Sequence, residues 1–314
     1  MKQLKVERYN ASKRSTWDEF VASSKNGTFL FYRKYMEYHA ERFMDFSLMF
    51  YDGDSLIAVL PANRKNELFM SHEGLTDGGV ITNQSMNMVT MLALFDELEN
   101  YLRSEGVSKI IYKAIPHIYH SFPAEEDLYA LFVKHASLIR RDVSSTLLLN
   151  ERISLRKHAK YEIHKGKKFG LRVERSYDFS SFMDIVKDLL ETKYHVQPVH
   201  TVKEIQLLAD IFPENIKLFS VFDDDVMVGG IIIYETKNVA HVQYMATTQK
   251  GKKQRALYLL LEYLFNEVYP QKKYFDFGIS TEKAGCYLNK GLISFKEQFG
   301  ARAITYDFYE MSIE

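Results

Sequence analysis

A short basic loop offers the clearest potential for chemistry in this sequence. It follows a predicted strand at residues 239–247 and opens a predicted helix. Backbone N–H groups and the helix dipole at such a position suit a phosphate or pyrophosphate, and the basic side chains add positive charge. We therefore predict a cofactor-binding loop made of Gln249, Lys250, Gly251, Lys252, Lys253, Gln254 and Arg255. The alternative is an ordinary exposed turn that lysine keeps soluble.

The strand before this loop carries polar side chains at alternating positions. Because side chains alternate along a strand, we expect His241 and Gln243 on one face and Val242 and Tyr244 on the other. The histidine would be either a functional group or a satisfied, hydrogen-bonded one. Tyr244 would be either a functional group or part of the core.

The remaining reactive side chains give weaker signals. Cys286 has no histidine beside it in the sequence, so we expect a small buried residue rather than a nucleophile. His117 and His120 are flanked by prolines, and no Cys/His cluster has zinc-ligand spacing, so no metal site is predicted. A basic, helical connector at residues 152–168, which includes Arg156, would either steer a phosphate-bearing partner or form a solvated face.

Composition limits the classes of protein to consider. The chain has 314 residues, which suits two domains, and a formal net charge of zero, which indicates no broad nucleic-acid-binding surface. A single cysteine excludes an internal disulfide and fits a reducing compartment. Residues 1–8 lack a secretory apolar stretch, and the apolar runs at 226–234 and 257–265 are far shorter than the ~20 residues that span a bilayer. We therefore expect a cytoplasmic protein without a transmembrane segment.

The elements that would position these residues occur twice along the chain. The segment Leu4-Lys5-Val6-Glu7-Arg8 returns as Leu171-Arg172-Val173-Glu174-Arg175, each time before a helix with a serine at its start. A hairpin pattern then occurs at residues 47–60 and again at 218–234, and an amphipathic helix followed by a strand ends both series. The first of these helices would bury Val89, Leu92, Phe95, Leu98 and Leu102. Each half thus contains a strand, two helices, three strands, a helix and a strand.

That order resembles the GNAT acyltransferase fold, and two such units resemble the Fem-type peptidoglycan aminoacyl ligases and their acetyltransferase-like relatives. The resemblance covers nearly the whole chain, and its closing motif comprises Phe275-Asp276-Phe277-Gly278, Gly291-Leu292 and Phe295-Lys296-Glu297-Gln298-Phe299-Gly300. It implies an α/β fold with mixed sheets and two packed tandem GNAT-like units. Residues 1–148 would form the acceptor side, and residues 149–314, with the basic connector, would bind the donor and carry the chemistry.

The resemblance also suggests roles for particular residues. In a GNAT-like sheet the strand at 239–247 separates from the strand at 275–277, and the gap holds the acyl group. His241 or Tyr244 would then lie beside the reacting carbonyl, Glu282 would act as a base, and Lys296 would hold a phosphate or the tetrahedral oxygen. Each of these has a structural alternative, such as a solvated Glu282 or a surface Lys296. The candidate substrate-binding residues are Gln243, Asp276, Ser280 and Arg156.

These implications lead to one expected function and two alternatives. We expect acyl transfer from acyl-coenzyme A to an amine of an amino sugar or another cell-envelope precursor. The loop has one glycine where typical GNAT enzymes have two small residues, which leaves the donor open. One alternative is an aminoacyl-tRNA-dependent ligase, although the chain has no segment for the two-helix arm of such ligases. The other is a degenerate GNAT protein that binds without catalysis.

Overall fold

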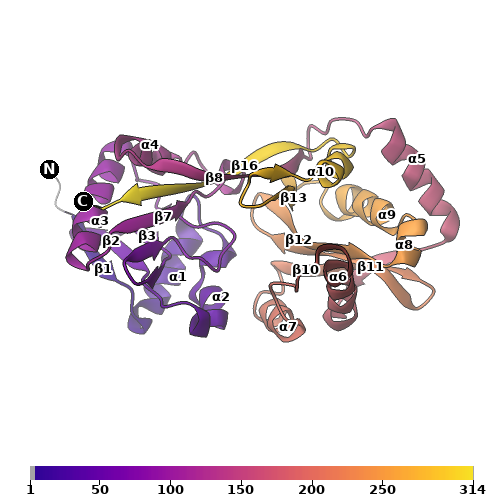
Figure 1. Cartoon of the computed structure of the whole chain (residues 1–314), viewed down its shortest axis with the longest axis horizontal. Coiled ribbons are helices and arrows are strands. Elements are labelled where there is room, and N and C mark those ends of the chain that lie inside the picture. Colours follow the sequence, from indigo (N-terminus) through magenta and orange to yellow (C-terminus); the bar gives the residue numbers. More distant parts are fainter. Residues whose placement is uncertain (1–3, 314) are drawn as a thin grey trace. The chain divides into compact units, whose positions relative to one another are not determined.

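The computed structural model describes residues 4–313, so Met1 to Gln3 of the N-terminal segment considered above lie outside the described residues. The chain divides into two compact units. Unit 1 comprises Met1–Asp142, Glu282–Tyr287 and Thr305–Glu314, and unit 2 comprises Val143–Thr281 and Leu288–Ile304. Figure 1 shows both units as mixtures of helices and strands, as the predicted fold class requires.

Unit 1 contains the first copy of the predicted series, with five strands where three were predicted between the second and third helices. Its first elements are β1 (Leu4–Arg8), α1 (Arg14–Ser23), α2 (Arg33–Met36), β2 (Leu48–Asp52), β3 (Ser55–Leu60), β4 (Asn63–Lys65), β5 (Leu68–Met70) and β6 (Ile81–Thr82). They are followed by α3 (Met88–Ser104), β7 (Lys109–Lys113), α4 (Glu126–Val133) and β8 (Ser137–Leu148). One sheet has the order β1-β2-β3-β6, and a second set of paired strands runs β4-β5-β7-β16, where β16 comprises Arg302–Ser312.

Helix α3 covers the core of unit 1, with one difference from the predicted face. Met91, Leu94, Phe95, Leu98 and Leu102 are buried in one hydrophobic cluster with the strands. The prediction for Val89 was wrong, because this side chain is 79% exposed. At 3.6 residues per turn, a position six residues before Phe95 lies roughly 120° away from the buried stripe.

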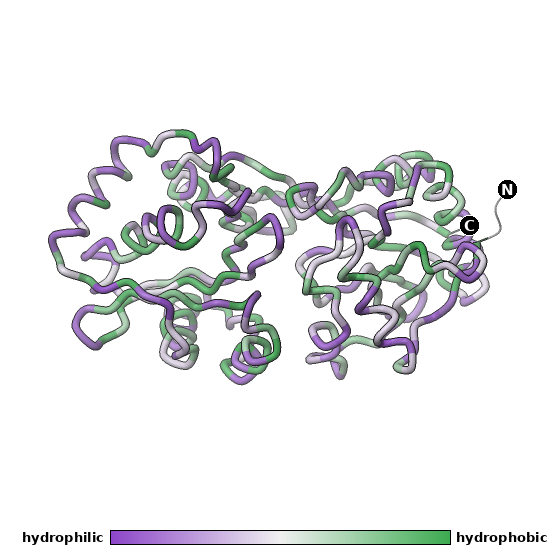
Figure 2. The backbone as a smooth tube through the Cα atoms, turned by 180° about the vertical axis from the view of Figure 1, so that it is seen from behind, coloured by the Kyte–Doolittle hydropathy of each residue, from purple (hydrophilic) through white to green (hydrophobic). Residues whose placement is uncertain are grey.

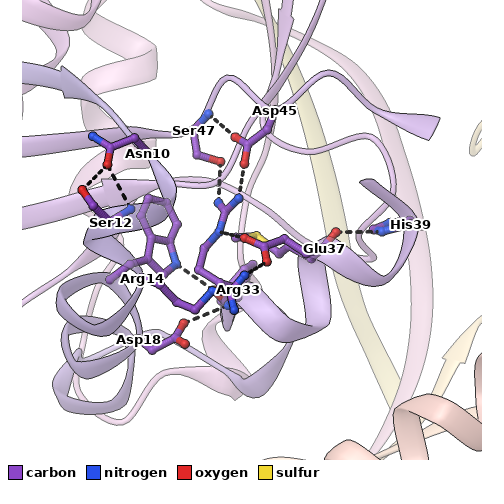
Figure 3. Close-up of polar contacts among 12 residues, drawn as sticks. Asn10, Ser12, Arg14, Asp18, Arg33, Glu37, His39, Asp45 and Ser47 are labelled. Carbon is purple, nitrogen blue, oxygen red and sulfur yellow. Dashed lines mark hydrogen bonds and ion pairs between the residues drawn. The ribbon is translucent and has the colours of Figure 1, made fainter. Parts of the chain in front are cut away.

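A buried arginine organises the first helices of unit 1 (Figure 3). The Arg33 side chain is 3% exposed, donates from Nε to Glu37 Oε1 at 3.1 Å and from Nη1 to Ser47 Oγ at 3.2 Å, and forms an ion pair with Asp45. Its Cζ lies 3.7 Å from the centre of the Tyr9 ring. A buried charge with this many partners is compensated, so we interpret the cluster as structural.

Unit 2 contains the second copy. Its elements are α5 (Lys157–Gly166), β9 (Arg172–Ser176), α6 (Phe179–Tyr194), α7 (Val202–Ile211), β10 (Ile216–Asp223), β11 (Val226–Glu235), β12 (Val239–Thr247), α8 (Gln249–Lys253), α9 (Ala256–Tyr263), β13 (Tyr274–Ile279) and α10 (Lys290–Glu297). The strand order is β8-β13-β12-β11-β10-β9. A short hairpin of β14 (Thr281–Glu282) and β15 (Tyr287–Leu288) precedes α10, and β16 (Arg302–Ser312) ends the described chain.

Helices cover both faces of the unit 2 strands. Helices α6 and α7 lie on one side of β10, β11 and β12, and α5 and α9 lie on the other (Figure 1). Figure 2 shows α5 as mostly hydrophilic, in agreement with the predicted basic connector, whereas the central strands are mostly hydrophobic. The capping box of α7 is present, with Thr201 and Glu204 bonding each other's backbone N–H groups as predicted.

The observed units differ from the predicted division in three segments. Residues 143–148 belong to unit 2, and the chain returns to unit 1 at 282–287 and 305–314. The return at the end arises because β16 pairs antiparallel with β7, from Phe308 opposite Lys113 to Ser312 opposite Lys109. A strand pattern in the sequence does not specify its partner, since that choice depends on long-range pairing.

Candidate active site in the second unit

Two neighbouring strands of unit 2 pair over only part of their length. Strands β12 and β13 are parallel and are paired at Val239 with Tyr274, Ala240 with Phe275 and His241 with Asp276. Within the described part of unit 2, β12 continues to Thr247 and β13 to Ile279 without further pairing to each other. Beyond these residues the main-chain groups of the two strands do not bond each other, which is the arrangement that an extended ligand can use.

Both strands are irregular at the point where they separate. In β12, Tyr244 pairs with Ile232 and Val242 with Ile233, so Gln243 is an extra residue in the ladder. In β13, the pairing with β8 shifts between Asp276 and Ile279, where Gly278 has a φ of 73°. Bulges bend the strands that carry them, and two bends at one point account for the gap.

The extra residue in β12 also changes which side chains share a face. Val242 and Met245 both pack with the hydrophobic cluster on the α9 side. Residues that are paired across an antiparallel ladder share a face, so His241 and Tyr244 lie together on the α6 side. The predicted alternation, which separated His241 from Tyr244, was therefore wrong, because a bulge inserts one residue into the two-residue period.

A histidine and a carboxylate meet where the gap begins. His241 Nδ1 lies 2.8 Å from Asp276 Oδ2, and the side chain of Asp276 is fully buried. Thr146 Oγ1 donates to Asp276 Oδ1 at 2.7 Å, and Ser144 Oγ donates to the same oxygen. Burial raises the pKa of Asp276. Hydrogen bonds from His241 and the two hydroxyls, together with the charge of His241, outweigh this effect and bring the pKa below its ordinary value. Asp276 is therefore a buried carboxylate whose oxygens accept hydrogen bonds from protein groups, and its predicted role in substrate binding stays a prediction.

Lys296 reaches the same region from α10. Its Nζ donates to the carbonyl oxygens of Gly278 at 2.7 Å and Ile279 at 2.8 Å, and the residue is 2% exposed. Burial lowers its pKa to about 8, although the negative charge of Asp276 opposes this shift. An ammonium group has three N–H donors, so two anchor the group and fix the direction of the third.

Tyr244 and Ser280, two further predicted site residues, belong to unit 2 and have surroundings unlike those of Asp276 and Lys296. The Tyr244 hydroxyl accepts the backbone N–H of His200 at 3.2 Å and lies 2.8 Å from His200 Nδ1. It thus holds the segment between α6 and α7. Ser280 is 1% exposed, and its Oγ has no hydrogen-bond partner among residues 4–313.

Two side chains that the sequence singled out are on the surface. Glu282, the predicted base, is exposed and lies in segment 282–287, which clusters with unit 1 rather than with His241 and Lys296. Cys286 in the same segment is exposed, so the expectation of a buried residue was wrong. It follows the positive-φ residues Lys283, Ala284 and Gly285, a turn that leaves Cys286 at the surface.

The predicted phosphate-binding loop forms a short helix whose glycine serves packing. A Cβ on Gly251 would lie 2.2 Å from the carbonyl oxygen of Val228, so only glycine fits against β11. The Gly251 N–H donates to Thr248 Oγ1 at 3.0 Å, which occupies one of the amide groups that a phosphate would use.

The charges of the loop are divided between protein partners and solvent. Lys250 Nζ and Gln254 Nε2 both contact Asp223 Oδ2, at 2.5 and 2.8 Å, and Arg255 forms an ion pair with Glu162. Lys252 and Lys253 are exposed, and neither ammonium group has an ion-pair partner in the described chain. Lys252 and Lys253 are thus the two cations of the loop that could bind a ligand without losing an ion pair. Gln249 is also exposed.

Sequence reasoning missed the hydroxyls that hold Asp276. Ser144, Ser145 and Thr146 form a buried run of hydroxyl residues between Val143 and Leu147 of β8, and most buried hydroxyls have a hydrogen-bond partner. That run is the signal that could have identified them. Arg156, a predicted substrate-binding residue, is exposed and has Glu297 as an ion-pair partner at 3.9 Å.

Residues 4–313 contain no group of three or more His, Cys, Asp or Glu side chains arranged to hold a metal ion. No helix within the same range combines the length and apolarity needed to cross a bilayer.

Comparisons with known proteins agree with the fold. Residues 154–284 match the family described as acetyltransferase (GNAT) domain. The solved structure of FemX has a TM-score of 0.67 at 12% identity and covers 96% of each chain. L-PGS from Bacillus licheniformis has a TM-score of 0.57 at 11% identity, covering 97% of this chain and 92% of that chain. A tandem GNAT protein from the clavulanic acid biosynthesis pathway has a TM-score of 0.56 at 10% identity, covering 99% of each.

No curated protein matches the sequence. The solved structures share too little sequence to show more than the fold. At that level, the predicted resemblance to tandem GNAT and Fem-type proteins is confirmed.

Proposed function

We propose that the protein transfers an acyl group from acyl-coenzyme A to an amine. The premise is that the second unit of this chain is a GNAT acetyltransferase domain in a tandem GNAT fold. The observation that carries this proposal is the partial pairing of β12 and β13, which ends at His241 and Asp276. An acyl thioester in the gap would have its carbonyl beside the imidazole and the ammonium group.

Lys296 is suited to stabilise the charge that develops during acyl transfer. Attack of an amine converts the carbonyl oxygen into an oxyanion, and a preoriented donor lowers the energy of that state. Two N–H groups of Lys296 are held by the carbonyls of Gly278 and Ile279, so the third is available in a fixed direction. This role makes no use of Lys296 as a phosphate ligand.

The donor would extend from the gap to the α8 loop. Lys252 and Lys253 are the exposed cations there, and they would neutralise the pyrophosphate of coenzyme A. Lys250, Gln254 and Arg255 would contribute through the ion pairs and hydrogen bonds that shape the loop. A cytoplasmic location, as the composition predicts, would supply the thioester.

For the acceptor we propose an amine of an amino sugar or another cell-envelope precursor, with unit 1 as the acceptor side. The fold shared with FemX and L-PGS supports this class.

One observation favours a second donor. Helix α5 exposes Lys157 and Lys160, and Lys168 follows it, which together would suit the phosphates of an aminoacyl-tRNA. In that case tRNA binding would weaken steeply with salt, and a gel shift at two salt concentrations would detect it. A chain that binds neither donor would be the non-catalytic alternative.

The donor is tested by thermal unfolding with a panel of acyl-coenzyme A compounds. A ligand at one hundred times its Kd stabilises the native state by about 2.7 kcal/mol, so a bound thioester should raise the Tm measurably. The double variant Lys252→Ala, Lys253→Ala should show a smaller increase in Tm, because the two positive charges that would contact the pyrophosphate are lost. The matched control is Lys203→Ala with Lys237→Ala, two exposed lysines away from the loop. Absence of any shift with the wild-type protein would contradict the proposed donor.

A further inference from the structure

We propose that His241 is the general base of the transfer and that Asp276, held by Ser144 and Thr146, is the positioning residue that sets its tautomer. This inference rests on the proposed acyl transfer and adds the identity and control of the proton acceptor. It is carried by a chain of contacts across three neighbouring strands, β8, β13 and β12.

The contact between His241 and Asp276 determines which ring nitrogen carries the proton. A carboxylate only accepts hydrogen bonds, so the 2.8 Å contact from Nδ1 to Oδ2 requires the proton on Nδ1. In the neutral ring the lone pair is then on Nε2. That nitrogen is the one able to take a proton from an attacking amine.

The carboxylate itself is fixed in one orientation. Its Oδ1 accepts the hydroxyl hydrogens of Ser144 and Thr146, and its Oδ2 remains for His241. Both hydroxyls come from β8, which pairs with β13 at Asp276 opposite Thr146. Because Asp276 is fully buried, its charge acts on the imidazole with little screening by solvent.

The proposed step balances as follows. The amine nitrogen forms a C–N bond with the thioester carbonyl carbon, and its N–H proton passes to Nε2 of His241. The resulting imidazolium is stabilised by the negative charge of Asp276, and the oxyanion by Lys296. Collapse of the tetrahedral intermediate breaks the C–S bond, and the proton on Nε2 moves to the departing sulfur, which leaves as a thiol.

The other candidate bases fit this role less well. The Tyr244 hydroxyl already accepts the backbone N–H of His200. Burial raises the pKa of Tyr244, so its side chain stays a neutral phenol, which is a poor proton acceptor. Glu282 is exposed and belongs to the segment that clusters with unit 1. His241 is in contact with a buried carboxylate and borders the gap.

The tautomer can be measured directly by NMR of protein labelled with ¹⁵N in the imidazole rings. Comparison with His241→Gln assigns the signals of His241. We expect protonated Nδ1 and unprotonated Nε2 in the neutral ring of the wild-type protein. The opposite tautomer in the wild type would overturn the proposal, and this result does not depend on any variant of Asp276.

The Asp276→Asn variant tests the positioning role. An amide N–H can donate to Nδ1, so the proton should move to Nε2, and kcat should fall by about 100-fold or more with KM nearly unchanged. The matched control is Asp188→Asn, an exposed position on α6, which should keep the wild-type tautomer. An unchanged tautomer and rate in Asp276→Asn would contradict the proposal.

The experiment separates this inference from the proposed function. If the wild type shows the expected tautomer but no acyl-coenzyme A compound raises its Tm, the proposed donor fails and the dyad stands as a structural finding. If the donor binds and is used while the tautomer is the opposite one, the acyl transfer stands and His241 is not its base.

Discussion

At the scale of single residues, His72 of unit 1 combines an unusual backbone with an unusual environment. Its φ is 56°, it is 5% exposed, and its Nδ1 has no hydrogen-bond partner among the described residues. Burial, assisted by the charges of His39 and Lys113, lowers its pKa to about 3. The folded protein therefore keeps this imidazole neutral where an unfolded chain would protonate it.

This difference predicts a pH dependence of stability. Unfolded histidine has a pKa of about 6.5, so between about pH 6.5 and 3 the unfolded state binds a proton that the folded state does not. The free energy of unfolding should thus fall as the pH decreases through this range. In His72→Asn the fall should be shallower by up to about 1.4 kcal/mol per pH unit, as asparagine tolerates positive φ without titrating. Urea unfolding at several pH values measures the slope.

A matched control exists in the same chain. His195 has the same φ of 56° but is exposed, so His195→Asn makes the same change at a matched backbone position. The pKa of His120 is lowered to about 4 and that of Asp127 is raised to about 6, so these residues change the free energy of unfolding with pH in opposite directions. Both are present in the wild type and in the two variants. Equal slopes for wild type and His72→Asn would contradict the assignment.

At the scale of elements, the gap in unit 2 depends on two local irregularities. Gln243 is an extra residue in β12, and Gly278 gives β13 a left-handed backbone position. A Cβ at Gly278 would lie 3.4 Å from the Val242 carbonyl oxygen, an ordinary contact. Substitution there would act through the backbone conformation rather than through a clash.

We therefore expect Gly278→Ala to reduce donor binding. A side chain at positive φ costs about 1 kcal/mol or more, so the strand should relax toward an ordinary extended conformation and narrow the gap. The increase in Tm with acyl-coenzyme A should be smaller than in the wild type. Gly53→Ala, in the β2–β3 turn with a φ of 60°, should cost similar stability but keep the full ligand effect. An undiminished ligand effect in Gly278→Ala would show that the gap does not depend on this residue.

At the scale of the whole molecule, the two copies of the fold differ at the corresponding strands. Strands β6 and β7 of unit 1 occupy the positions of β12 and β13, and they lie in separate sheets. The space beside them contains Tyr112, whose hydroxyl accepts the Val80 N–H at 2.8 Å and donates to Asp127 Oδ2 at 2.5 Å. Tyr112 is 1% exposed, so the copy in unit 1 is filled by its own side chains.

This asymmetry predicts one donor per chain. Isothermal titration with the acyl-coenzyme A compound that gives the largest Tm shift should yield a stoichiometry of about one, because β12 and β13 stop pairing after His241 and Asp276, whereas the buried Tyr112 lies at the corresponding strands of unit 1. The Lys252→Ala and Lys253→Ala double variant should weaken that single binding event. Two events of similar affinity would show that unit 1 also accepts the donor.

The sequence by itself determined the elements that depend on local pattern. The strand at 4–8, the strand predicted at 171–175 and found at 172–176, the hairpins and the capping box of Thr201 follow from side-chain periodicity and turn residues, which act over a few positions. The order of these elements led to two tandem GNAT-like units through its resemblance to that fold. The same resemblance drew attention to His241, Asp276 and Lys296, although not to their contacts.

Only the tertiary structure decided how these elements combine. The pairing of β16 with β7, the extra residue at Gln243 and the hydroxyls of Ser144 and Thr146 on Asp276 involve residues far apart in the chain or a break in the period. Strand partners and buried hydrogen bonds are set by the packing of whole elements, whose energies no local pattern contains. The sequence could therefore name the residues around the gap, but the order in which they contact one another required the folded chain.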